Sequence, residues 1–135
     1  MNQRQRSALA QRYESDGMAG SSPQKLLLAV FQRLRSDLEG ASAAIVAGRV
    51  EEAHQLLLHA QDLVHELDLA LDTDTWEGGT ELRALYRHLM AVLMEANLTK
   101  SAAMVGRGLD IVVPLGDTWS EAYRLLNDEP APSIT

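Results

Sequence analysis

Apolar residues recur at intervals of three and four along this chain, the spacing expected where one face of an α-helix packs against other helices. The pattern is clearest in the stretch LRALYRHLMAVLMEAN. One set of its residues forms a core-facing line: Leu82, Leu85, Leu89, Val92 and Ala96. At about 100° per residue, a second set lies on the flank of that line: Tyr86, Met90, Met94 and Asn97. Methionine-rich surfaces adapt to irregular partners, so this flank is a candidate binding surface.

Local signals mark both ends of the first long helix. Ser22 can cap free backbone N–H groups, and Pro23 suits a first helical turn that has no use for the N–H it lacks. Gly48 supplies a left-handed stop. Between these signals, Phe31 lies beside a regular core-facing line: Leu27, Val30, Leu34, Leu38, Ala41 and Ile45.

The second helix is predicted from Val50 to Leu71, roughly 30 Å long. Its core-facing residues alternate in steps of three and four: Val50, Ala53, Leu57, Ala60, Val64, Leu67 and Leu71. Three further residues widen this line to one side and predict contact with two neighbouring helices: Leu56, Leu63 and Ala70. The loop from Asp72 to Gly79 follows, and its Trp76 either packs over the end of the bundle or is exposed for a partner. The third helix is the Leu82 to Asn97 stretch.

The last helix contains residues that usually break helices, Pro114 and Gly116. Its apolar positions nevertheless keep one phase on both sides of them: Val105, Leu109, Val112, Trp119, Tyr123 and Leu126. A free loop would have no reason to preserve this phase, so we expect one helix kinked near Pro114. Two shorter helices in line are the alternative.

These elements predict an all-α protein, an antiparallel up-and-down four-helix bundle with short connections. We expect an N-terminal arm or short helix over residues 1–20, the helical bundle over 21–126 and a disordered tail over 127–135.

Composition narrows the classes of function. The 135-residue chain has a formal net charge of −7 without a basic face, which argues against nucleic-acid binding. It contains no cysteine, so disulfides and thiolate metal sites are excluded and a cytoplasmic setting fits best. No apolar run approaches the roughly 18 residues that a membrane span requires, so no membrane insertion is expected.

The chain offers little material for catalysis or cofactor binding. Di-iron bundles use Glu-x-x-His on two helices, whereas here Glu51 and His54 match once. The similar pair of Asp62 and His65 lies on the same helix about 16 Å further along, too far to share a metal cluster. We interpret these four side chains as solvated, and find no ligand partners near His59 or His88 in the sequence. Nucleophile elbows and phosphate loops are absent as well, so no enzyme activity, metal or cofactor is expected.

Several motifs together resemble the FliS family of flagellar export chaperones. The third predicted helix carries the strongest of them: Leu85-Tyr86, Leu89-Met90, Leu93 and Ala96-Asn97. Others follow in the family's order: Tyr13, Ser22-Pro23-x-Lys25-Leu26, Val30-Phe31, Gly48, Glu66-Leu67, Gly78-Gly79 and Trp119. His88 replaces an aromatic residue of the signature, the stretch from Gly79 to Tyr86 is about one turn short, and Pro114 departs from the family's helix formers.

The resemblance implies a cytoplasmic chaperone that binds the C-terminal segment of flagellin, prevents premature polymerisation and presents it to the export apparatus. Components of the flagellar export gate are further implied partners. The predicted client groove comprises Tyr13, Phe31, Leu58, Leu69, Tyr86, Met90, Met94 and Asn97. Leu58 and Leu69 are included because they lie off the core line, eleven residues apart on one helical face.

Other interpretations of these residues stay open. The aromatic and methionine side chains would also suit the edge of the core, Asn97 could brace the turn before the last helix, and the arm with Tyr13 could cover the groove until a client displaces it. The alternative function is a homo-oligomeric structural bundle without a client. The expected oligomeric state is a monomer or a weak homodimer.

Overall fold

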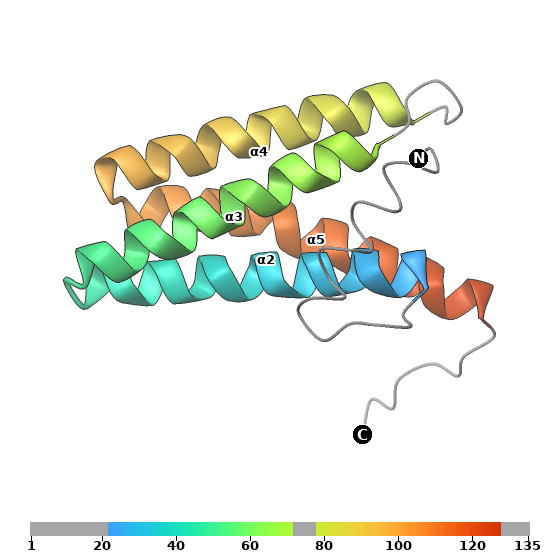
Figure 1. Ribbon diagram of the computed structural model, residues 1–135, viewed down its shortest axis with the longest axis horizontal. Coiled ribbons are helices and arrows are strands. Elements are labelled where there is room, and N and C mark those ends of the chain that lie inside the picture. Colours follow the sequence, from blue (N-terminus) through green and yellow to red (C-terminus); the bar gives the residue numbers. More distant parts are fainter. Residues whose placement is uncertain (1–21, 72–77, 128–135) are drawn as a thin grey trace.

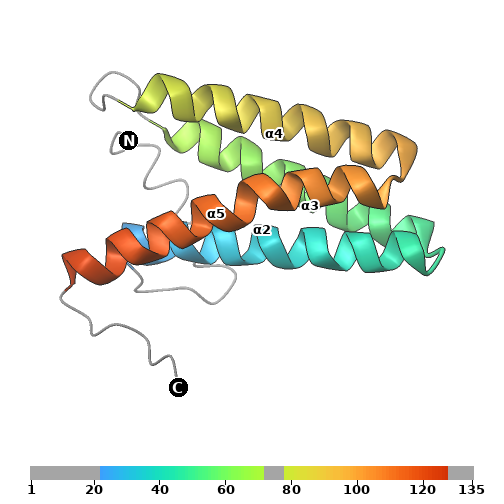
Figure 2. The same ribbon diagram turned by 180° about the vertical axis from the view of Figure 1, so that it is seen from behind.

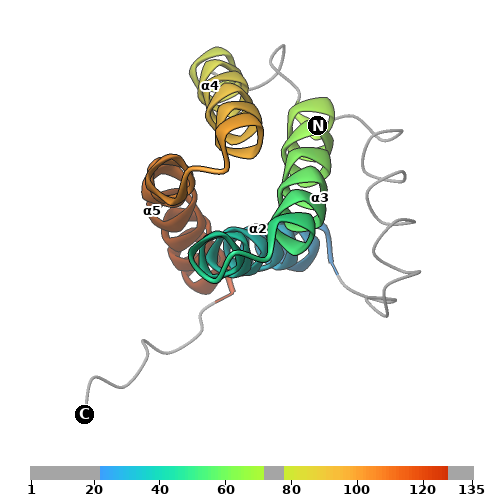
Figure 3. The same ribbon diagram turned by 90° about the vertical axis from the view of Figure 1, so that its left-hand side faces the viewer.

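The computed structural model describes residues 22–71 and 78–127, which form an antiparallel four-helix bundle (Figure 1). Its helices are α2 (Pro23–Val46), α3 (Val50–Ala70), α4 (Gly79–Thr99) and α5 (Ala102–Leu126). Each helix packs against two others, α2 and α4 both lying between α3 and α5, so that the four surround one core (Figures 2 and 3). The predicted all-α four-helix bundle is confirmed.

The ends of the helices follow the local signals. The Ser22 hydroxyl accepts a hydrogen bond from the Lys25 N–H at 3.2 Å, and Gly48 adopts a φ of 77° just after α2. The prediction for the third helix was too short, because α4 begins at Gly79 rather than at Leu82. Its first turn carries no apolar spacing and is held by the backbone, where the Leu82 N–H donates to the Gly78 carbonyl at 3.1 Å.

The core is built from the predicted apolar lines. Leu34, Leu57 and Leu89 are fully buried, and all belong to one cluster drawn from the four helices. Val50 was wrongly predicted to face the core: it is the first residue of α3, directly after the turn from α2, and is 56% exposed. As expected from the widened apolar line, α3 contacts two helices, α2 and α4.

The last helix runs unbroken through Pro114, so the alternative of two shorter helices is wrong. Proline removes the N–H that would bond to the carbonyl of Asp110. Both Pro114 and Asp110 are exposed, so water can satisfy that carbonyl without a buried loss. The continuous apolar phase on the other side of α5 then keeps the helix on the bundle.

A glycine sets how closely α5 approaches α4. Gly108 is buried, and a Cβ atom placed there would lie 2.9 Å from Cδ2 of Leu93. Two residues earlier, a Cβ atom on Gly106 would meet nothing within 4 Å. The two glycines therefore have different roles in the same helix: Gly108 is a close packing contact, whereas Gly106 is a half-buried position with room for a side chain.

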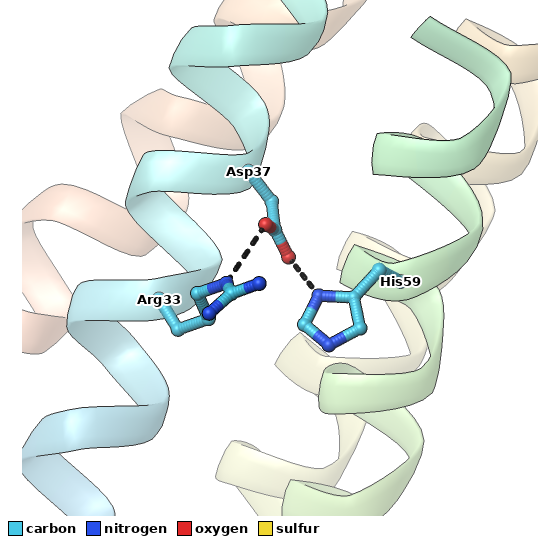
Figure 4. Close-up of polar contacts among 3 residues, drawn as sticks. All are labelled: Arg33, Asp37 and His59. Carbon is cyan, nitrogen blue, oxygen red and sulfur yellow. Dashed lines mark hydrogen bonds and ion pairs between the residues drawn. The ribbon is translucent and has the colours of Figure 1, made fainter. Parts of the chain in front are cut away.

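A buried carboxylate links α2 to α3. Asp37 is only 2% exposed, and its Oδ2 accepts a hydrogen bond from Nδ1 of His59 at 2.5 Å (Figure 4). Its other oxygen accepts one from Nε of Arg33 at 3.3 Å. Helical spacing could not identify this partner of His59, because Asp37 lies 22 residues away on another helix. Burial of a charge is tolerable here because both oxygens have charged or polar donors.

Substitution of the two glycines should have opposite effects on stability. Gly106→Ala should raise the free energy of unfolding by about 0.5–1 kcal/mol, because alanine lowers the backbone entropy of the unfolded chain and its Cβ clashes with nothing in the folded one. Gly108→Ala should lower it by about 1–2 kcal/mol, because buried Leu93 can yield only by displacing other core side chains. Urea denaturation measures both changes. Equal stabilisation by the two substitutions would show that α5 does not depend on this close contact.

The Asp37 cluster predicts that replacing His59 alone destabilises the fold more than replacing His59 and Asp37 together. His59→Leu should cost about 2 kcal/mol of unfolding free energy, because it leaves the buried carboxylate with one donor fewer. Asp37→Leu combined with His59→Leu should recover most of that loss, since no charge then remains buried. Chemical denaturation checks both values, with His88→Leu, at an exposed histidine, as the control expected to change little. A double variant less stable than His59→Leu would contradict this account.

Candidate partner-binding groove

Two surface hollows lie along the seam between α3 and α4. One, of about 120 Å³, is lined by Val64, His65, Asp68, Tyr86, Arg87 and Met90. The other, of about 370 Å³, is lined by His54, Gln61, Met94, Asn97, Leu98 and Lys100. We call the two together the α3–α4 groove. Because the helices are antiparallel, the residue numbers fall along one wall as they rise along the other.

Polar contacts between the helices mark the two ends of this groove. At one end Nε of Arg83 donates to Oδ1 of Asp68 at 3.1 Å. At the other, Nδ1 of His54 lies 3.1 Å from Oδ1 of Asn97. Residues 54 to 68 of α3 separate these contacts, a helical distance of roughly 21 Å. A helix of about fourteen residues would match this length.

The predicted flank of α4 forms one wall of the groove. The structure brings together Tyr86, Met90, Met94 and Asn97 in that order along it. Tyr86 is 3% exposed and lies at the floor, Met90 is half-buried, and Met94 is 56% exposed at the rim. Tyr86 is therefore part of the core and also lines the groove, and its role in binding stays a prediction.

On α3, Leu58 and Leu69 line neither hollow but lie beside the residues that do. They are 40% and 49% exposed, unusually open positions for leucine in a small bundle. On a helix of 3.6 residues per turn they share a face with the groove-lining residues His54, Gln61 and His65. Apolar side chains thus border the groove on both helices.

Two of the predicted groove residues are not joined to this surface. Phe31 is 3% exposed and lines a separate hollow of about 170 Å³ between α2 and α5, where a Cβ on Gly116 would lie 3.4 Å from it. Tyr13 lies outside the described residues, as do Trp76, the arm and the tail after Asn127. Periodicity identified Phe31 as flanking the core line but not which pair of helices it would lie between.

A polar cluster of His54, Asn97 and Lys100 lies at one end of the groove and was not predicted from the sequence. His54 was interpreted as a solvated side chain, but it is half-buried and contacts Asn97 across the seam. Nζ of Lys100 donates to the carbonyl of Asn97 at 2.5 Å and to its side-chain Oδ1 at 2.7 Å. Asn97 therefore braces the turn before α5 and lines the groove. Helical spacing could not reveal the cluster, because two of its members lie 43 residues apart.

Three residues of the α4 motif, Tyr86, Met90 and Asn97, thus line one wall of the groove, whereas Leu89, Leu93 and Ala96 of the same motif lie in the core. Comparison with known proteins places the sequence in a family. The sequence matches the family described as "Flagellar protein FliS" over residues 5–125. The chain belongs to the FliS family. It is also similar to the flagellar secretion chaperone FliS of Bacillus subtilis (strain 168), with 23% identity over 112 residues, covering 83% of this chain and 84% of that relative. The resemblance found in the motifs is confirmed.

In this FliS-family chain, the described helices show neither a membrane span nor a metal centre. Across residues 22–71 and 78–127, no helix combines the length and apolar character needed to cross a bilayer. Within the same ranges, no three or more His, Cys, Asp or Glu side chains are grouped to hold a metal ion. The groove is where the described surface brings together Tyr86, Met90 and Asn97 of the α4 motif.

The floor of the groove has one strongly perturbed ionisable group. Burial raises the pKa of the Tyr86 phenol well above its ordinary value of 10, and the negative charge of Asp68 adds to the effect. The phenol is therefore neutral in the folded protein throughout the physiological pH range. Tyr86 therefore contributes an uncharged hydroxyl to the floor of the groove.

The raised pKa of Tyr86 predicts a loss of stability in alkali. Below about pH 10 the phenol is protonated in both folded and unfolded states, and its contribution to stability is intact. Above that pH the unfolded chain releases the proton while the folded chain retains it, so stability falls by up to about 1.4 kcal/mol per pH unit. Urea denaturation at about pH 9 to 11.5 measures this loss. The free energy of unfolding of Tyr86→Phe should decline less steeply with pH than that of the wild type. The control Tyr123→Phe retains Tyr86 and should decline like the wild type, and a Tyr86→Phe profile identical to wild type would contradict the prediction.

Proposed function

We propose that this protein is a cytoplasmic secretion chaperone that binds the C-terminal segment of flagellin in the α3–α4 groove. Membership of the FliS family, and a relative named as a flagellar secretion chaperone, support the general role. The observation that carries the proposed site is the apolar border of the groove, where Leu58, Leu69 and Met94 are between 40% and 56% exposed. Such a border is unfavourable in water and favourable under a partner.

The physical problem that such a chaperone solves concerns an unpaired amphipathic segment. A filament subunit buries its terminal segments only against other subunits, so before export they expose apolar surface that promotes association. A helix-in-groove complex covers this surface with the apolar face of the client toward the chaperone. Covering it blocks premature polymerisation and keeps the segment ready for transfer to the export apparatus.

The character of the groove favours reversible binding. Its side chains Met90 and Met94 are flexible and polarizable, so they can fit the irregular face of a client helix. A disordered client loses conformational entropy when it folds on the groove, which holds affinity below what the contact area alone would give. A moderate affinity suits a chaperone that must release its client at the export gate.

Binding should be measured by titrating the whole protein with a peptide from the C-terminal end of the flagellin of the same organism. Isothermal titration calorimetry is expected to give a one-to-one complex, and circular dichroism a gain in helicity beyond the sum of the components. Sedimentation addresses the other candidate, a homo-oligomeric bundle. A stable dimer that ignores the peptide would replace the chaperone proposal with that alternative.

Charge introduced on the border of the groove should weaken binding without unfolding the bundle. Leu58→Glu, Leu69→Glu and Met94→Glu each remove apolar contact and place an unpaired carboxylate against the client, so each should weaken peptide binding about five- to tenfold. Their exposure predicts changes in unfolding free energy within about 0.5 kcal/mol.

The matched control for these variants is Leu125→Glu. Leu125 is 62% exposed and lies near the end of α5, a helix that contributes no residue to either hollow of the α3–α4 groove. The Leu125→Glu variant should bind the peptide with the same affinity as the wild type. If all four variants bind equally well, the client does not occupy this groove.

A further inference from the structure

The larger hollow of the groove ends at a lysine with spare capacity to bind an anion. Lys100 is one of two lysines in the chain, and its ammonium group uses two of its three N–H donors on Asn97. Among the described residues, no carboxylate forms an ion pair with it. Among the described residues, its hydrogen-bond partners are neutral oxygens, so the positive charge of the ammonium group attracts an acidic group.

The hydrogen bonds around Asn97 determine which of its atoms remain available. An ammonium group only donates, so the atom of Asn97 that lies 2.7 Å from Nζ of Lys100 must be the oxygen. The same oxygen then accepts from Nδ1–H of His54. Among the described residues, the side-chain NH₂ of Asn97 donates to no acceptor, so it is a second donor beside the hollow. Two donors, one of them charged, thus meet at one end of an apolar surface.

The conformation of Lys100 is a separate observation in favour of a binding role. It ends α4 in the left-handed region, with φ 52° and ψ 46°, where glycine is the residue most readily accommodated. Among the described non-glycine residues it alone has a positive φ. Strain of this kind is often retained where a side chain is needed in a fixed place.

The remaining lining of the hollow suits the end of a peptide chain. Met94 is 56% exposed and Leu98 is 86% exposed, so apolar surface adjoins the two donors. A volume of about 370 Å³ lies within the roughly 300–1,000 Å³ range of ligand sites. A carboxylate for the donors and an apolar side chain for Met94 and Leu98 are both found in the last residue of a polypeptide.

We propose that Lys100 and Asn97 bind the terminal carboxylate of the client, which fixes the direction in which the client lies. This inference rests on the proposed function, because the C-terminal segment of flagellin supplies the free carboxylate. The residues before the terminus would then run along the groove past Met94 and Met90 toward Tyr86. Over roughly 21 Å this accommodates about fourteen helical residues.

The test compares two forms of one client peptide, with a free C-terminal acid and with a C-terminal amide. General electrostatics predicts that the amide binds more tightly, because the chain has a formal charge of −7 and repels an added anion. The proposed site predicts the opposite, with the free acid binding about five- to tenfold more tightly because it gains charge-assisted hydrogen bonds. Since only the peptide is altered, the result does not depend on how a variant folds.

Substitution of the lysine then locates the effect. Lys100→Gln should reduce the preference for the free acid to less than about twofold, and Lys25→Gln, which removes the other lysine near the start of α2, should leave it unchanged. Lys100→Gly relieves the left-handed backbone, so it should lose the preference while remaining folded by circular dichroism. Equal binding of both peptides to the wild type, or an acid preference that survives both Lys100 variants, overturns this inference and leaves the proposed function standing. Failure of both peptides to bind overturns the proposed function together with the inference.

Discussion

The packing of α3 against α4 leaves more apolar surface than two antiparallel helices can bury between them. Each helix has an apolar face directed at the common core and a second apolar flank directed outward along their seam. The core takes up Leu57 and Leu89, while Met94 and Leu58 remain substantially exposed. This excess of apolar surface over available partners is what the candidate groove consists of.

Polar contacts hold α3 on both sides and so keep the groove in shape. Toward α2, the buried carboxylate of Asp37 accepts a hydrogen bond from His59. Toward α4, Asp68 binds Arg83, which also donates to the carbonyls of Asp68 and Leu71 at the end of α3. These contacts have directional geometry, which apolar packing lacks, and they fix the position of the helix along its axis. The outer face of α3 is thereby free to carry side chains chosen for a partner.

The groove combines a fixed floor with an adaptable rim. Tyr86 is buried and uncharged, so the floor is set by the folding of the bundle itself. The rim residues are exposed and flexible, and changing them costs the fold little. A division of this kind explains how a small bundle can bind an apolar segment and yet remain stable without it, as the proposed role of a secretion chaperone requires.

The sequence by itself determined the helices, their order and the family. Apolar spacing, the Ser22 cap and the Gly48 stop are local properties of the chain, and the phase maintained across Pro114 predicted a single last helix for the same reason.

The tertiary structure decided which flanking residues share a surface. It grouped Tyr86, Met90, Met94 and Asn97 along one seam, and placed Phe31 at another. It also paired His59 with Asp37 and His54 with Asn97. Such pairings depend on the rotation and axial register of helices distant in sequence, and these are set by packing of the whole core rather than by any local period.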